Sequence, residues 1–132
     1  MVHLPLYTAL TAAIIMIFQM ILMMIVGFRR VKHQQILGDG GHEDLIMLIR
    51  RYGNLTENAP MFIAVLALLE MMTSGSSLIL SLGLSFIVVR ISHAVGLTVG
   101  GPNPFRLVGA FGTLLLGCGT AIYLLYNVAQ AI

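Results

Sequence analysis

Apolar residues fall into four long runs along the chain, separated by short polar connections. The first run covers residues 6–28 and is interrupted only by Thr8, Thr11, Gln19 and Gly27. The other runs cover residues 55–72, 78–99 and 106–129. At 1.5 Å per helical residue, each run is long enough to cross a hydrocarbon core about 30 Å thick. The pattern predicts an all-α membrane protein with four transmembrane helices in one bundle.

The connections contain residues typical of turns and helix breaks. They are GDGG at residues 38–41, TSGSS at 73–77 and GGPNP at 100–104. GDGG is not expected to be a phosphate-binding loop, because no strand precedes it and no Lys-Ser/Thr follows. The second helix is predicted to start at Asp39 or His42, to be amphipathic at first, and to end at Met72 within the membrane. Pro60 should kink this helix or be accommodated by neighbouring groups.

Composition supports a single membrane domain covering residues 1–132. Hydrophobic residues make up 58% of the chain and charged residues 9%, against roughly 25% charged in soluble domains. The first run is expected to be a retained span, because it is too long for a signal peptide and lacks a basic start. The single Cys118 excludes an internal disulfide and a cysteine metal site, and we interpret it as a small packing residue. The net charge of +2 is too small to indicate nucleic-acid binding.

The basic residues all fall on one side of the predicted membrane region. They are Arg29, Arg30, Lys32, Arg50, Arg51, Arg90 and Arg106. The start of the chain, the TSGSS turn and the C-terminal tail carry none. The positive-inside rule therefore predicts that both termini lie outside and that the two basic connections face the cytoplasm.

A polar triad stands where the second helix enters the membrane. Arg50, Asn54 and Glu57 are spaced i, i+4 and i+7, so they share one helix face. Charge at this depth is costly unless it faces a cavity, a protein interior or a partner, which makes the triad a functional candidate. The alternative is a structural hydrogen-bond cluster that joins helices.

Arg90, His93 and Arg106 are predicted to lie in the same layer. No Ser/His/Asp arrangement and no metal-ligand spacing accompany them, and His93 alone could be an interior histidine. Arginines suit a small molecule that carries carboxylates, because guanidinium and carboxylate form paired hydrogen bonds. Glu57 and Asn54 could hold an amine and amides. Glutathione is one ligand with these groups, although composition alone does not single it out.

Two motifs resemble the MAPEG family, the membrane-associated proteins of eicosanoid and glutathione metabolism. The first is Arg50-xxx-Asn54-xx-Glu57-xx-Pro60. The second, Arg90-xx-His93 with an arginine sixteen residues after Arg90, is similar to the prostaglandin E synthase branch. GDGG, RYGNLTEN and ALLE also resemble small bacterial members. The resemblance covers nearly the whole chain.

The resemblance implies a homotrimer in the bacterial inner membrane, with glutathione bound between subunits at the cytoplasmic side. Arg50, Asn54 and Glu57 match glutathione contacts, and Arg90 and His93 match positions in the third helix. Arg106 matches the arginine assigned to thiol activation. Arg29 or Arg30 resembles an arginine supplied by the neighbouring subunit. The chain departs from several eukaryotic members, which have a tyrosine in place of Leu97 and an aromatic residue in place of Asn58. It also has Leu107 where the prostaglandin branch often has a serine.

The leading hypothesis is a glutathione transferase or peroxidase that acts on lipophilic electrophiles from the bilayer. A non-catalytic protein that binds a lipid or an acidic metabolite at the same residues is the alternative. A transporter is disfavoured, because Glu57 lies at a helix entry and Glu70 near the opposite edge. Small residues at positions 109, 113, 117 and 121 predict close helix contact within or between subunits.

Overall fold

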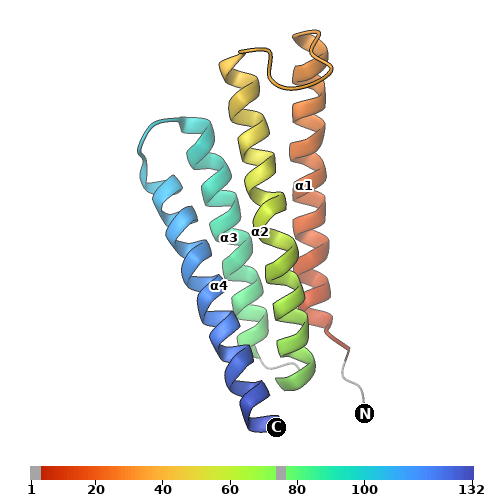
Figure 1. Ribbon diagram of the computed structural model, residues 1–132, viewed down its shortest axis with the longest axis vertical. Coiled ribbons are helices and arrows are strands. Elements are labelled where there is room, and N and C mark those ends of the chain that lie inside the picture. Colours follow the sequence, from red (N-terminus) through yellow and green to blue (C-terminus); the bar gives the residue numbers. More distant parts are fainter. Residues whose placement is uncertain (1–3, 74–76) are drawn as a thin grey trace.

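A computed structural model describes residues 4–73 and 77–132, and within them it contains four α-helices and no strand. The helices are α1 (Leu6–Lys32), α2 (Glu43–Thr73), α3 (Ser77–Val99) and α4 (Pro104–Ala131). Figure 1 shows them side by side as one elongated bundle. All four are long and apolar enough to cross a membrane. The predicted four-helix, all-α membrane fold is confirmed.

Helices α1 and α2 extend well beyond their apolar runs at the end that carries the basic residues, whereas α3 ends with its run at Val99. α1 continues through Arg29, Arg30 and Lys32, which occupy its last turn. Cations stabilise this position because the carboxyl end of a helix carries partial negative charge. α2 continues through Pro60 as a single α-helix. The TSGSS turn lies largely outside the described residues, since 74–76 are not among them.

The two basic connections are turns that glycines make possible. Gly38 in GDGG has φ +66° and Gly100 in GGPNP has φ +78°, a region that residues with a Cβ rarely adopt. Asn103 then caps α4, because its Oδ1 accepts from the Arg106 backbone N–H at 3.0 Å. Its Nδ2 donates to the Gly96 carbonyl at 2.8 Å. Asn103 therefore joins the end of α3 to the start of α4.

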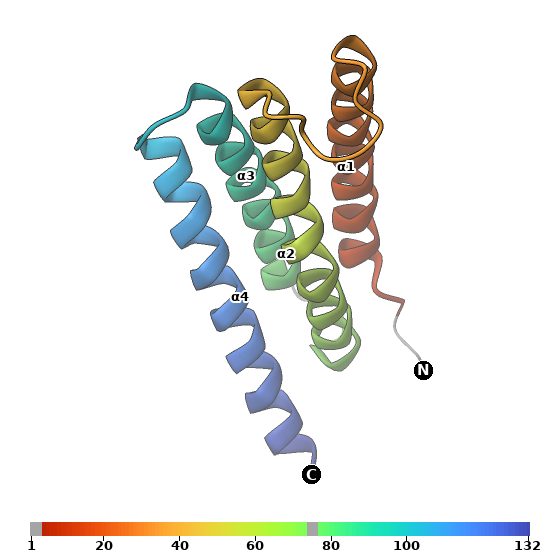
Figure 2. The ribbon, with the colours of Figure 1, turned by 45° about the horizontal axis from the view of Figure 1, so that its top comes forward.

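The chain ends lie at one end of the bundle, and the α1–α2 and α3–α4 connections lie at the other (Figure 1). Helices α2 and α3 contact both outer helices, whereas α1 and α4 do not contact each other within the described residues. Figure 2 shows α1 and α4 at opposite edges. Only Gly109 and Thr120 of α4 are buried. The outer surface of α4 is therefore free for lipid or for another subunit.

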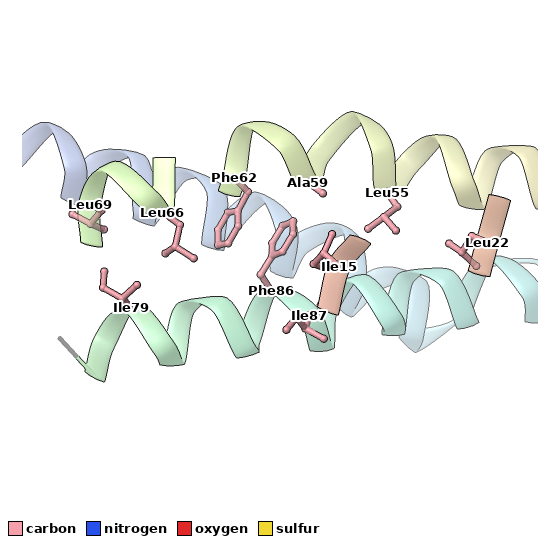
Figure 3. Close-up of a cluster of buried hydrophobic side chains, with 10 residues drawn as sticks. All are labelled: Ile15, Leu22, Leu55, Ala59, Phe62, Leu66, Leu69, Ile79, Phe86 and Ile87. Atoms are coloured by element: carbon pink, nitrogen blue, oxygen red, sulfur yellow. The ribbon is translucent and has the colours of Figure 1, made fainter. Parts of the chain in front are cut away.

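A cluster of buried apolar side chains runs along α1, α2 and α3 and forms the main part of the core (Figure 3). Its members are Ile15, Leu22, Leu55, Ala59, Phe62, Leu66, Leu69, Ile79, Phe86 and Ile87. Phe62 of α2 stacks on Phe86 of α3 with ring centroids 3.9 Å apart. The guanidinium of Arg90 lies 5.9 Å from the centre of the Phe86 ring. The first buried polar residue on the basic side of this aromatic pair is therefore Arg90, one helical turn after Phe86.

Glu70 joins α2 to the start of α1 at the end of the bundle that is farthest from the basic residues. Its side chain is only 2% exposed, and its carboxylate accepts from the backbone N–H groups of Tyr7 at 2.9 Å and Thr8 at 2.7 Å. The Thr8 hydroxyl also donates to it at 2.7 Å. The first N–H groups of a helix have no partner within the helix, and the helix dipole favours an anion there. Glu70 therefore caps α1 from α2, which explains a carboxylate at this depth.

Helices α3 and α4 approach closely through glycines. A Cβ on Gly96 would overlap the backbone of Arg106, and one on Gly109 would overlap the backbone of His93. The predicted small-residue contact is therefore present at Gly109. At Gly117 it is absent within the subunit, where a Cβ would meet no atom within 4 Å. Eight residues turn an α-helix by about 80° beyond two full turns, so the stripe has rotated away from α3 by Gly117.

Candidate functional site

A cavity of about 410 Å³ lies between α2, α3 and α4, and we call it the polar cavity because a guanidinium, an imidazole and two amides line it together with apolar groups. Its lining consists of Asn54, Asn58, Arg90, His93, Ala110, Thr113, Leu114, Gly117 and Cys118. Helix α2 supplies the two amides, α3 supplies the guanidinium and imidazole, and α4 supplies the remaining wall. The structure thus brings three predicted site residues together: Asn54, Arg90 and His93.

Arg90 is the most deeply buried cation of this cavity, with 3% of its surface exposed. Its Nη1 donates to the side-chain oxygen of Asn54 at 2.9 Å and to the Asn54 carbonyl at 3.3 Å. No Asp or Glu of the described chain pairs with it, and its buried Nε has no hydrogen-bond partner. A buried charge without a counter-ion is strongly unfavourable. The cavity is therefore electrostatically suited to a ligand that carries an anionic group.

Amides and an imidazole complete the polar wall. His93 is buried because its backbone lies against Gly109 of α4. Asn58 donates through Nδ2 to the Asn54 carbonyl at 2.8 Å. The sequence reading treated Asn58 only as a departure from the family pattern. Its i, i+4 relation to Asn54 was the available signal that both amides would face one cavity.

A second, mainly apolar cavity of about 270 Å³ adjoins the polar one. Its lining consists of Glu57, Asn58, Met61, Phe62, Val65, Phe86, Thr113, Gly117 and Ala121. Asn58, Thr113 and Gly117 line both cavities. The predicted site residue Glu57 therefore lies beside the polar cavity, on its apolar side. The first cavity can therefore hold a polar group and the second an apolar group, and the two groups can belong to one ligand or to two.

Arg106 lies apart from the polar cavity in the folded chain. Its side chain is exposed and lines a cavity of about 380 Å³ formed by the α3–α4 connection and the first turns of α4. Ala110 lines both this cavity and the polar one. Arg106 therefore lies near the polar cavity without lining it, and Ala110 separates the two.

The remaining predicted arginines are dispersed at the basic end of the bundle. Arg29 forms an ion pair with Asp44 at 3.2 Å. Arg30 donates through Nη1 to the Ile36 carbonyl at 3.0 Å and so fastens the α1–α2 connection. Arg50 is exposed and lines none of the cavities described here. The structure does not bring these three arginines to the polar cavity.

Two residues differ from what the sequence suggested. Cys118 is exposed and lines the polar cavity, so the interpretation as a small packing residue is wrong. Arg51 was passed over in favour of Arg50, yet Arg51 is the one placed between helices: its Nη1 donates to the Thr98 hydroxyl at 2.8 Å. A helix turns about 100° per residue, so adjacent arginines face different neighbours.

The comparison with known protein families agrees with this architecture. Residues 8–126 match the family described as MAPEG. That range begins near the start of α1 and ends near the end of α4, so it includes every residue of both cavities. No curated protein matches the chain significantly.

Proposed function

Because this chain belongs to the MAPEG family, we propose that it is a glutathione-dependent transferase or peroxidase acting on lipophilic electrophiles. The family consists of membrane proteins and includes glutathione transferases and related enzymes, and this chain is an integral membrane protein. The observation that carries the proposal is Arg90, a buried cation without a counter-ion that faces a polar cavity. A carboxylate of glutathione would supply the missing anion.

In this proposal each of the two adjoining cavities binds one substrate. Asn54, Asn58 and Arg90 hold carboxylate and amide groups of glutathione, and Glu57 holds its ammonium group. The lipophilic electrophile occupies the apolar cavity, which α2 and α4 flank on the bundle surface. This arrangement suits a substrate that arrives from the bilayer.

The chemistry requires the thiolate, because the thiol is a weak nucleophile. A guanidinium beside the sulfur stabilises the anion, and lowering a thiol pKa of about 8.5 by two units takes about 2.7 kcal/mol. In the transferase reaction the thiol proton goes to solvent. The sulfur then forms a bond to the electrophilic carbon, and the leaving group departs with its bonding pair. In the peroxidase reaction two glutathione molecules are oxidised to the disulfide, while a hydroperoxide is reduced to an alcohol and water.

We propose that a homotrimer completes this site. One subunit leaves α4 almost fully exposed and keeps α1 and α4 apart, so neighbouring copies have free helix faces to pack against. Assembly would bring an arginine from the end of a neighbour's α1 (Arg29 or Arg30) toward the α2–α4 cavities. Native mass spectrometry in mild detergent should show three chains, and a monomer would contradict the assembly.

The second candidate function is non-catalytic binding of a lipid or an acidic metabolite at the polar cavity. Two observations favour it: Leu97 stands where related enzymes have a tyrosine, and Arg106 does not line the polar cavity. Such a protein would bind glutathione or another acid without turnover.

Purified full-length protein tests the proposal. We expect glutathione-dependent conversion of a chlorodinitrobenzene-type electrophile, and Arg90→Gln should raise the KM for glutathione about tenfold or more, because one charge-assisted pair is lost. Lys32→Gln is the matched control, since it removes an exposed cation from the same end of the bundle. Thermal stabilisation by glutathione without turnover would favour the second function. Equal effects of the two variants would remove Arg90 from the site.

A further inference from the structure

A separate cavity of about 210 Å³ lies at the basic end of the bundle, between α1, α2 and α3. Its charged and polar lining comes from Arg29, Asp44, Arg51 and Thr98. Met47, Leu48 and Leu97 form the apolar part. No lining residue is shared with the polar cavity that contains Arg90, so the two are distinct sites.

Hydrogen bonds fix the position of the Arg51 guanidinium in this cavity. Its Nη1 donates to the Thr98 hydroxyl at 2.8 Å, and that hydroxyl donates in turn to the Ala94 carbonyl at 2.9 Å. The Thr98 oxygen is therefore oriented to accept from the guanidinium. The Arg51 Nε is buried and has no hydrogen-bond partner. A guanidinium fixed in this way loses less side-chain entropy when it binds an anion.

The charges around the cavity do not balance. Asp44 is the acidic residue in the lining, and it already contacts two other groups: Arg29 at 3.2 Å and the His33 ring nitrogen at 3.0 Å. No acidic residue of the described chain pairs with Arg51. The cavity therefore has an uncompensated positive charge.

The position of Arg51 along α2 indicates how deep its charge lies in the membrane. Arg51 precedes the apolar run that begins at Leu55 by one helical turn. Arg29 stands at the end of α1 and Thr98 at the end of α3, so all three lie at the same end of the bundle. This is where the hydrocarbon core meets the headgroup region, and a guanidinium there can meet a phosphate beside apolar surface.

We propose that the cavity around Arg51 binds a phosphate group, with Arg51 and Arg29 as its cationic ligands. The phosphate belongs either to the headgroup of an anionic phospholipid or to a free phosphate ester. Arginine suits either source, because its planar fork matches two phosphate oxygens. Met47, Leu48 and Leu97 would contact the apolar part of a lipid. This proposal does not depend on glutathione binding at Arg90.

The test measures binding to the purified full-length protein by isothermal titration. The probes are short-chain phosphatidylglycerol, short-chain phosphatidylcholine and inorganic phosphate. Arg51→Gln should weaken binding of the phosphate-bearing anion about tenfold or more, since a charge-assisted bond is lost. Lys32→Gln removes a cation at the same end without touching the cavity and should leave the affinity within about twofold.

The probes also separate the two sources of phosphate. Tighter binding of phosphatidylglycerol than of both other probes identifies the lipid headgroup, and binding of inorganic phosphate that matches it identifies a free phosphate ester. Equal affinity for phosphatidylglycerol and phosphatidylcholine, with none for phosphate, would overturn the proposal, because both lipids carry a phosphate and only phosphatidylglycerol has the net negative charge that the cavity should select. So would equal losses in Arg51→Gln and Lys32→Gln. Displacement of the probe by glutathione would also overturn it, because the cavity would then be part of the thiol site.

A measurement on the unaltered protein covers the case in which Arg51→Gln does not fold. Phenylglyoxal modifies accessible guanidinium groups, and mass spectrometry locates the modified arginine. The bound probe should slow modification of Arg51 and leave that of the exposed Arg50 unchanged. Equal protection of the two adjacent arginines would contradict a specific site.

Discussion

At the scale of single residues, Arg106 and Glu57 line two different cavities that adjoin the polar one. In the proposed reaction Arg106 would act on the sulfur, and Glu57 would bind the ammonium group of glutathione. If Arg106 stabilises the sulfur anion, Arg106→Leu should lower kcat about 25-fold at pH 7, as the thiol pKa returns from about 6.5 to about 8.5, and change glutathione affinity only modestly. The loss follows from a thiol pKa that rises by about two units, because an interaction stronger in the anion is removed. Glu57→Gln should instead raise KM first.

The thiolate absorbs in the ultraviolet where the thiol does not, so the pKa of bound glutathione can be titrated in both variants. The depressed thiol pKa keeps the reactive form present as pH falls, and its loss in Arg106→Leu should move the titration to higher pH. An unchanged thiolate titration in Arg106→Leu would remove this residue from the mechanism. Arg90 would then be tested next.

The sequence indicated the polar residues of the site more reliably than their partners. Helical spacing grouped Arg90 with His93, and in the structure both are buried and line the same cavity. It could not show that Arg90 meets Asn54 across 36 residues, because that contact depends on how α2 and α3 pack. The prediction for Cys118 was wrong for the same reason: its neighbours along the chain are apolar, while the polar residues of the cavity that it lines come from α2 and α3.

Glu70 provides a test of a single buried carboxylate with a structural role. Glu70→Gln keeps one acceptor oxygen and removes the charge, so we expect a loss of about 1–3 kcal/mol in unfolding free energy. Unfolding in mixed micelles, followed by circular dichroism, measures the change. Glu43→Gln is the control, because Glu43 is an exposed carboxylate on the same helix. Equal stability of the two variants would contradict capping of α1 by Glu70.

At the scale of elements, the close contact between α3 and α4 depends on two glycines. Gly96 of α3 lies against the backbone of α4, and Gly109 of α4 lies against the backbone of α3. The sequence showed small residues every four positions but not which of them meet α3. Because the stripe turns by about 40° at each step, Gly109 meets α3 whereas Gly117 faces the cavities. Periodicity thus predicted a close contact, and the twist of the bundle decided where it occurs.

Gly109→Ala should destabilise the bundle by about 1–3 kcal/mol, because the new methyl group would overlap the backbone of His93. Gly119→Ala is matched, since it lies in the same helix and its Cβ would meet no atom within 4 Å. That control should be neutral or more stable by about 0.5–1 kcal/mol, as alanine favours helix over glycine. Thermal melts of the two variants in detergent measure the difference. A Gly109→Ala variant as stable as Gly119→Ala would show that α3 and α4 can separate freely.

At the scale of the whole molecule, the hydrophobic pattern was sufficient to predict the number of helices and their order. In a membrane every backbone polar group must be satisfied within the segment, so a long apolar run has few options besides a helix. Helix ends were less predictable. α1 extends to Lys32 because cations stabilise its last turn, although the apolar run stops at residue 28.

The orientation of the bundle in the membrane is the broadest prediction. Both chain ends lie opposite the two connections that carry or adjoin the seven Lys and Arg residues, and basic segments are retained in the cytoplasm. In a Cys118→Ala background, Ser77→Cys should react in intact cells with an impermeant maleimide, because Ser77 is exposed at the end of the bundle that carries the termini. Ile36→Cys, in the α1–α2 connection and 90% exposed, should react only after the membrane is permeabilised. The reverse pattern would place the polar cavity toward the outside and would exclude cytoplasmic glutathione as its ligand.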